Sequence, residues 1–99
     1  MYPNKVYIAL GTNLGNWKSN FNQALRLISK LGTIDKFGSI YLSKPYGFRN
    51  QNFFYNTAIE LSTSLSPRFL QISLELIEKK MKKNKLIING PRNIDLDII

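Results

Sequence analysis

The sequence has 99 residues, of which 14 are Lys or Arg and 6 are Asp or Glu, and it contains neither His nor Cys. This length is typical of a single domain, and the 43% of hydrophobic residues supply side chains for a packed core. The absence of Cys and His excludes disulfides, thiolate or imidazole metal ligands, and Cys or Ser-His-Asp catalysis. Any chemistry must therefore use carboxylates, amides, hydroxyls, Lys or Arg.

The composition predicts a soluble, cytoplasmic protein that attracts anions. No apolar stretch approaches the roughly 18 residues of a membrane span, and the N-terminus lacks the features of a secretory signal. The net charge of +8 produces a positive field that favours nucleic acids, nucleotides or phosphorylated metabolites as partners. Charge alone does not choose among these anions.

The first half of the chain predicts a strand, a helix and a second strand. Residues 6–10 form a short apolar run that suits a buried strand. Residues 11–15 lack the pattern of a phosphate-binding loop and are interpreted as a turn. Apolar side chains spaced by three, four or seven then predict a helix over residues 16–31, which Gly32 is placed to end. Residues 39–43 predict the second strand, and Pro45 and Gly47 mark a loop after it.

The second half predicts a strand, a helix and a final strand. Side chains alternate over residues 54–63, with one apolar face and one mixed face that carries Phe54 and Asn56. Ser66 and Pro67 begin a helix that is expected to run to about Lys82, and residues 93–99 form the last strand. This order predicts a single α+β domain with a ferredoxin-like βαββαβ core, in which two helices pack on one face of an antiparallel sheet. That fold hosts many functions and decides none of them.

Asp95 and Asp97, in the final strand, are the strongest chemical signal. Residues two apart project from the same face of a strand, so the two carboxylates lie side by side while Leu96 faces the core. Such a pair suits Mg²⁺, which proteins usually hold with one or two carboxylates together with substrate phosphates. Arg92 adds a guanidinium suited to bidentate contact with phosphate. The alternatives are a solvated strand face for the acids and an internal salt bridge from Arg92 to Asp95.

Phe54 and Asn56 form a second candidate site. They offer a stacking plane beside an amide that can donate and accept, which suits a planar heterocycle. The alternative is core packing for Phe54 and a turn or sheet-edge role for Asn56. A basic RNA-binding module is also considered, because the net charge is +8, lysines cluster over residues 79–85, and the predicted strands carry the aromatics Tyr41, Phe54 and Tyr55, although a recognisable RNA-binding sheet motif is missing.

Four motifs occur in order along the chain: YIALGTNLG at 7–15, SKPYG at 43–47, FYN at 54–56 and GPRNIDLDI at 90–98. Through them the sequence resembles the 6-hydroxymethyl-7,8-dihydropterin pyrophosphokinase family of folate biosynthesis, from about residue 7 to residue 99. The resemblance implies transfer of a pyrophosphoryl group from ATP to the hydroxymethyl oxygen of the dihydropterin, giving AMP and the pterin diphosphate. The expected partners are ATP and the pterin. We expect a cytoplasmic monomer with no membrane or nucleic-acid partner.

The resemblance also implies roles for single residues. Asp95 and Asp97 would hold two Mg²⁺ ions, and Arg92 would act in catalysis by contacting the triphosphate and stabilising developing charge. The pterin-binding positions are Tyr46, Phe54 and Asn56, and the ATP-binding positions are Glu78, Lys85, Arg92 and Ile98.

The sequence departs from the family pattern in two places. The family usually has Gly-Arg-x-Arg after the second helix and often Trp before Gly90, whereas this chain has lysines at 82, 83 and 85 and Asn89. Lys keeps the charge of Arg but loses its bidentate geometry. The family also continues past the Asp-x-Asp strand, with a His and an Arg that face ATP and an aromatic that completes the pterin sandwich. The expectation is a pyrophosphokinase core without that segment, and turnover by these 99 residues alone stays open.

Overall fold

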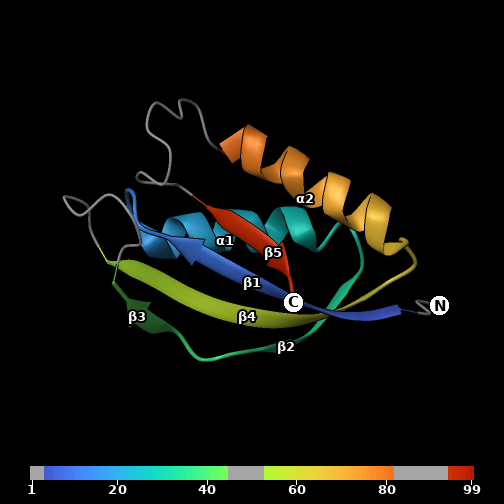
Figure 1. The fold of residues 1–99 in the computed structure, drawn as a ribbon, viewed down its shortest axis with the longest axis horizontal. Coiled ribbons are helices and arrows are strands. Elements are labelled where there is room, and N and C mark those ends of the chain that lie inside the picture. The colour runs from blue at the N-terminus through green and yellow to red at the C-terminus, as the bar shows by residue number, and fades with distance from the viewer. Residues whose placement is uncertain (1–3, 45–52, 82–93) are drawn as a thin grey trace.

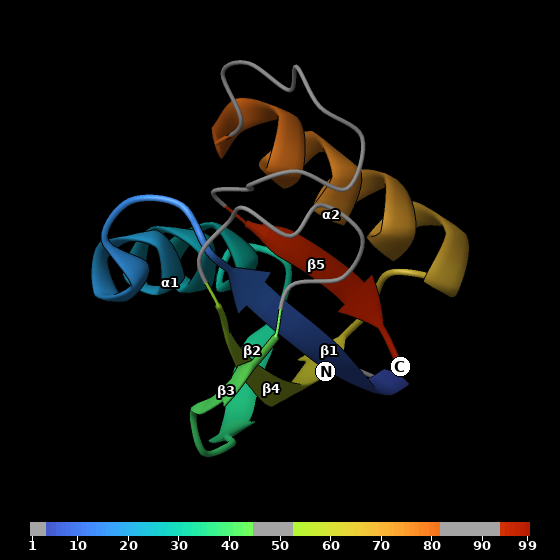
Figure 2. The same cartoon turned by 60° about the vertical axis from the view of Figure 1, so that its left-hand side comes forward.

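The computed structural model describes residues 4–44, 53–81 and 94–99, which form a sheet covered on one side by two helices (Figure 1). A second view shows the same arrangement of helices and sheet (Figure 2). The elements in chain order are β1 (Asn4–Thr12), α1 (Trp17–Ile28), β2 (Thr33–Phe37), β3 (Tyr41–Ser43), β4 (Phe54–Thr63), α2 (Pro67–Met81) and β5 (Asp95–Ile98). Neither helix in these described ranges combines the length and apolar character that a membrane span requires.

The strands form an antiparallel sheet in the order β2-β4-β1-β5, and β3 also pairs with β4. This is the predicted ferredoxin-like α+β arrangement, with one difference. The predicted second strand, residues 39–43, corresponds to β3, and an additional strand, β2, precedes it and pairs with a different part of β4.

The sequence analysis missed β2 because this strand has almost no buried side chains. Ile34 is half-buried, whereas Thr33, Asp35, Lys36 and Phe37 are exposed. An edge strand of this kind is held mainly by backbone pairing, which here includes an irregularity between Ile34 and Lys36. It therefore lacks the apolar alternation by which strands are recognised in a sequence.

Both helices begin where the sequence predicts. The Asn16 side chain caps α1 by accepting a hydrogen bond of 3.1 Å from the amide of Ser19. The Ser66 hydroxyl caps α2 by accepting one of 3.3 Å from the amide of Phe69. However, α1 ends at Ile28 rather than at residue 31, because the amide of Leu31 bonds to the carbonyl of Ile28 in a tighter, three-residue turn. The predicted end of α2 at Lys82 lies outside the described residues.

The hydrophobic core lies between the helices and one face of the sheet. Even-numbered residues of β1, such as Ile8 and Leu10, are buried there together with Ile59 and Leu61 of β4 and Leu96 of β5. The buried helix residues that cover them are Phe21, Ala24 and Ile28 of α1 and Leu70, Leu74, Ile77 and Met81 of α2. Because side chains alternate along a strand, the odd-numbered residues of β1 point to the opposite face, which neither helix covers.

That helix-free face carries a nearly buried carboxylate at one end. Glu60 is 5% exposed, and its Oε2 accepts a hydrogen bond of 2.9 Å from the Tyr7 hydroxyl. Lys5 Nζ lies 3.5 Å from Glu60 Oε1. The hydrogen bond to Glu60, together with the charge of that carboxylate, raises the pKa of the Tyr7 phenol above its ordinary value.

Because the pKa of Tyr7 is raised in the folded state, the stability of the protein depends on pH in the alkaline range. The folded state favours the neutral phenol, so the contribution of Tyr7 is present below the unfolded pKa of about 10 and is lost as pH rises through the higher folded pKa. We expect Tyr7→Phe to unfold at a lower temperature than the parent near neutral pH, and this deficit to shrink above about pH 10. Thermal unfolding of both proteins across this range tests the prediction, which a deficit independent of pH would contradict.

Candidate active site

Residues from four strands meet in one row across the helix-free face of the sheet. Asn56 of β4 pairs with Gly11 of β1, and Gly11 pairs on its other side with Asp95 of β5. Tyr41 of β3 lies beyond Asn56 in the same row, and Asp97 lies two residues along β5 from Asp95. The predicted heterocycle site and the predicted carboxylate site are therefore neighbours, separated by the width of one strand.

This row lines a pocket of about 120 Å³. Tyr41, Phe54 and Asn56 line one side of the pocket, and Asp95 and Asp97 line the other. Between the two sides lies strand β1, which contributes Ala9, Leu10 and Gly11. The pocket thus offers an aromatic ring and an amide opposite two carboxylates, over a floor with little side-chain bulk.

The sequence analysis assigned Gly11 to a turn, and this assignment is wrong. Gly11 and Thr12 belong to β1, where Gly11 pairs with Asn56 and Thr12 pairs with Tyr55. The apolar run that predicted the strand ended at Leu10, so it stopped short of the two residues. A glycine that directly follows a buried apolar run could have signalled a close backbone approach at the end of the strand.

The amide of Asn56 is oriented by its neighbours. Its Nδ2 donates hydrogen bonds of 2.8 Å to Ser43 Oγ, 3.2 Å to the Phe54 carbonyl and 3.4 Å to the Tyr41 carbonyl. The other end of the amide, Oδ1, faces Gly11, since a Cβ placed on Gly11 would lie 3.4 Å from it. The donor end of the amide is therefore used within the sheet, and an acceptor oxygen faces the pocket.

The two aspartates share the helix-free face as predicted from their spacing. Asp97 is exposed and Asp95 is half-buried, whereas Leu96 between them is 1% exposed and packs in the core. In the described ranges, no group of three or more His, Cys, Asp or Glu residues gathers around a possible metal position. A pair of carboxylates fits Mg²⁺, because this ion commonly takes its remaining oxygen ligands from phosphates and water.

Glu78 connects helix α2 to the strand that carries the aspartates. Its Oε2 accepts a hydrogen bond of 2.7 Å from the backbone amide of Leu96, on β5 at the edge of the described sheet. Ile98, the last residue of β5, is half-buried and packs against the core. Two of the residues that the resemblance assigns to ATP binding therefore lie on or against β5. Tyr46, Lys85 and Arg92, including the possible salt bridge from Arg92 to Asp95, lie outside the described residues.

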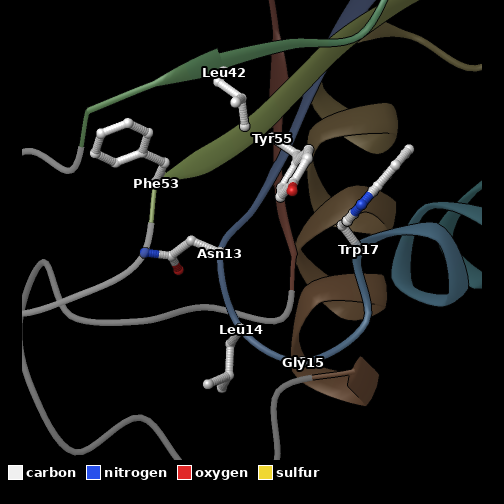
Figure 3. A pocket seen from close by; sticks show the side chains of 7 residues that line it. All are labelled: Asn13, Leu14, Gly15, Trp17, Leu42, Phe53 and Tyr55. Carbon is white, nitrogen blue, oxygen red and sulfur yellow. The ribbon is translucent and has the colours of Figure 1, made fainter.

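A larger pocket of about 380 Å³ lies on the other side of the sheet. Tyr55 points to the opposite face from its neighbour Phe54, and its ring stacks on Trp17 with centroids 4.7 Å apart (Figure 3). The remaining residues that line this pocket are Asn13, Leu14, Gly15, Leu42 and Phe53. None of the seven described lining residues carries a charged side chain.

The family model for 7,8-dihydro-6-hydroxymethylpterin-pyrophosphokinase (HPPK) matches residues 7–99. The chain belongs to the HPPK family. It is 38% identical over 98 residues to the 2-amino-4-hydroxy-6-hydroxymethyldihydropteridine pyrophosphokinase of Bacillus subtilis, and 35% identical over 94 residues to the protein of the same name from Aquifex aeolicus. It is also 44% identical over 95 residues to a folic acid synthesis protein of Pneumocystis carinii.

These matches cover almost all of this chain but only part of each relative. They include 97%, 95% and 95% of this chain for the Bacillus, Aquifex and Pneumocystis proteins, respectively. The chain spans 59% of the length of the Bacillus and Aquifex proteins and 13% of the Pneumocystis protein. The HPPK matches give no support to the alternative of an RNA-binding module.

The bond between Glu78 and Leu96 predicts that α2 stabilises β5. We expect Glu78→Ala to lower the free energy of unfolding by about 1.5–3 kcal/mol, the usual contribution of a hydrogen bond to a charged group. We also expect faster hydrogen exchange at the Leu96 amide, measured by NMR. Glu78→Gln keeps a carbonyl acceptor and should preserve most of the protection.

Glu75→Ala is the matched control, because Glu75 lies on the exposed side of α2 and its carboxylate accepts a hydrogen bond from Gln71 of the same helix. Unchanged protection of the Leu96 amide in Glu78→Ala would show that this bond does not hold β5 in place.

Proposed function

We propose that this chain carries the catalytic core of a pyrophosphokinase that acts on 6-hydroxymethyl-7,8-dihydropterin. The hydroxymethyl oxygen would attack the β-phosphorus of ATP, the bond from that phosphorus to the α,β-bridging oxygen would break, and the hydroxyl proton would be released. The products are AMP and the pterin diphosphate. The observation that carries this proposal is the row Asn56, Gly11 and Asp95, which brings an amide and a carboxylate to one pocket in a member of the HPPK family.

The pterin would bind on the Phe54 side of the pocket. Phe54 offers a ring on which a flat heterocycle can stack, and Asn56 Oδ1 offers an acceptor held in place by the bonds to β3 and β4. The exocyclic amino group and the neighbouring ring N–H of a pterin are donors on one edge. An acceptor aimed into the pocket complements that edge, and Tyr46 would add backbone contacts to the pocket wall.

The triphosphate would lie on the Asp95 side of the pocket. Asp95 and Asp97 would hold two Mg²⁺ ions with ATP, and these ions neutralise phosphate charge when they are bound. The two carboxylates would thereby place the triphosphate across β1 from the pterin, so that catalysis depends mainly on position and electrostatics. Arg92 would stabilise the charge that develops during transfer, and Glu78, Lys85 and Ile98 would complete the ATP side.

The proposal extends to a monomeric enzyme in the cytoplasm whose partners are ATP and the dihydropterin. It concerns binding first, because the chain spans 59% of the length of the Bacillus and Aquifex relatives. Both predictions below therefore measure binding rather than turnover.

Removing either aspartate should abolish magnesium-dependent nucleotide binding. We expect the parent to bind a nonhydrolysable ATP analogue more tightly with Mg²⁺ than with EDTA, and Asp95→Ala and Asp97→Ala to lose this difference. The reason is that the ions would lose a carboxylate ligand and half of the negative charge that the pair supplies. Isothermal titration calorimetry with Mg²⁺ and with EDTA measures the affinity of each protein for the ATP analogue. Glu75→Gln is the control for loss of one negative charge. Parent-like magnesium dependence in both variants would show that the ions are held elsewhere.

Removing the stacking ring or the acceptor should weaken pterin binding. We expect Phe54→Ala to bind 6-hydroxymethylpterin about tenfold more weakly or worse, since stacking of a base on an aromatic side chain contributes about 1–3 kcal/mol. Asn56→Ala should have a similar effect through loss of the Oδ1 acceptor. Fluorescence titration of the pterin measures both, with Asn22→Ala on the exposed side of α1 as control. Parent-like affinity in both variants would place the pterin outside this pocket.

A further inference from the structure

Gly11 occupies an unfavourable position for a glycine. It lies within β1 and is paired on both sides, with Asn56 and with Asp95. A glycine inside a strand contributes no side-chain packing and is less favourable there than alanine. Such a residue needs either a structural or a functional reason.

The other three glycines that the structure describes have a structural reason. Gly15 has a φ of 74°, in the left-handed region that side chains disfavour. A Cβ on Gly32 would lie 2.1 Å from the carbonyl oxygen of Ser62, and a Cβ on Gly38 would lie 2.9 Å from that of Ala58. In each case the backbone itself excludes a larger residue.

No such reason applies to Gly11. Its φ is outside the left-handed region, since Gly15 alone among the described glycines lies there. The atoms nearest to a Cβ on Gly11 would be Asn56 Oδ1 at 3.4 Å, Phe54 Cδ1 at 3.6 Å and Asp95 Cβ at 3.9 Å. These are ordinary van der Waals distances, so the fold has room for alanine at this position.

The space that alanine would take belongs to the pocket. The three side chains nearest to the missing Cβ are the stacking ring, the acceptor amide and one of the two carboxylates. A methyl group at their centre would stand on the floor of a pocket of only about 120 Å³. It would cover the β1 backbone at the point where Asn56 Oδ1 faces the ligand.

We propose that Gly11 is a specificity-determining residue that sets the depth of this pocket. Its missing side chain lets the donor edge of a flat nitrogen heterocycle reach the β1 backbone beside Asn56 Oδ1. This inference rests on the proposed function and adds a requirement to it. The ligand must be flat along the edge that faces β1, because a side chain at position 11 would occupy the space that this edge needs.

The test is Gly11→Ala in the 99-residue chain, with two measurements that should move in opposite directions. Thermal unfolding should occur at the same temperature as in the parent or higher, because alanine favours the strand. Binding of 6-hydroxymethylpterin should weaken by about tenfold or more, the effect of one methyl group in a close-fitting pocket. Magnesium-dependent binding of the ATP analogue should be retained.

Ala58→Ser is the matched control. Ala58 lies on the same sheet face, two residues along β4 from Asn56, and is not among the residues that line the pocket. Serine adds one heavy atom there, as alanine does at Gly11, and should leave pterin binding unchanged.

The outcomes separate this inference from the proposed function. If the parent binds the pterin and Gly11→Ala binds it equally well, Gly11 does not determine specificity, whereas the proposed function stands. If Gly11→Ala unfolds at a lower temperature than the parent, the glycine is required by the fold and the inference is wrong. If the parent itself does not bind the pterin, the proposed function fails and the inference fails with it.

Discussion

The antiparallel register of β1 between β4 and β5 is the constraint on which the fold and the candidate site both depend. β1 pairs with β4 along its whole length, from Asn4 opposite Thr63 to Thr12 opposite Tyr55. Because side chains alternate along each strand, a shift of one residue would exchange the two faces of a strand. It would place Asn56 in the core and expose Ile59 and Leu61. Burial of the apolar residues against the helices therefore also determines which polar residues lie on the other face. The free energy of core formation thereby positions the site.

The two halves of the site are held with unequal strength. The Phe54 and Asn56 half belongs to β4, a central strand with partners on both sides and with the donors of Asn56 bonded to β3. The aspartate half belongs to β5, which pairs with β1 only over Asp95–Ile98 and forms an edge of the described sheet. β5 depends in addition on burial of Ile94 and Leu96 and on the bond from Leu96 to Glu78. The position of the carboxylates thus depends on a direct hydrogen bond to helix α2, whereas the donors of Asn56 are bonded within the sheet.

The parts of this arrangement that depend on local pattern could be predicted from the sequence. The alternation of β4, the common face of Asp95 and Asp97, and both helix starts follow from side-chain period and capping residues. The proximity of Asn56 to Asp95 could not be derived in this way, because it depends on the pairing of strands far apart in the chain. β2 escaped prediction since its stability comes from backbone pairing rather than from buried side chains. The resemblance to the family supplied the roles of the residues, and the structure supplied their arrangement around Gly11.

At Gly11, the space that the pocket needs lowers the stability of the strand that lines it. A central strand is most stable when side chains cover both of its faces, and the helix face of β1 follows this rule with Ile8 and Leu10. On the other face, β1 carries only the methyl group of Ala9 and no side chain at Gly11 where the pocket lies, whereas Tyr7 beyond the pocket packs against Glu60. The loss of packing is thus confined to the residues beneath the pocket. A bound ligand would restore the stability that β1 loses at this position. A flat ring above Gly11 would make the contacts with β1 that side chains make elsewhere on the strand.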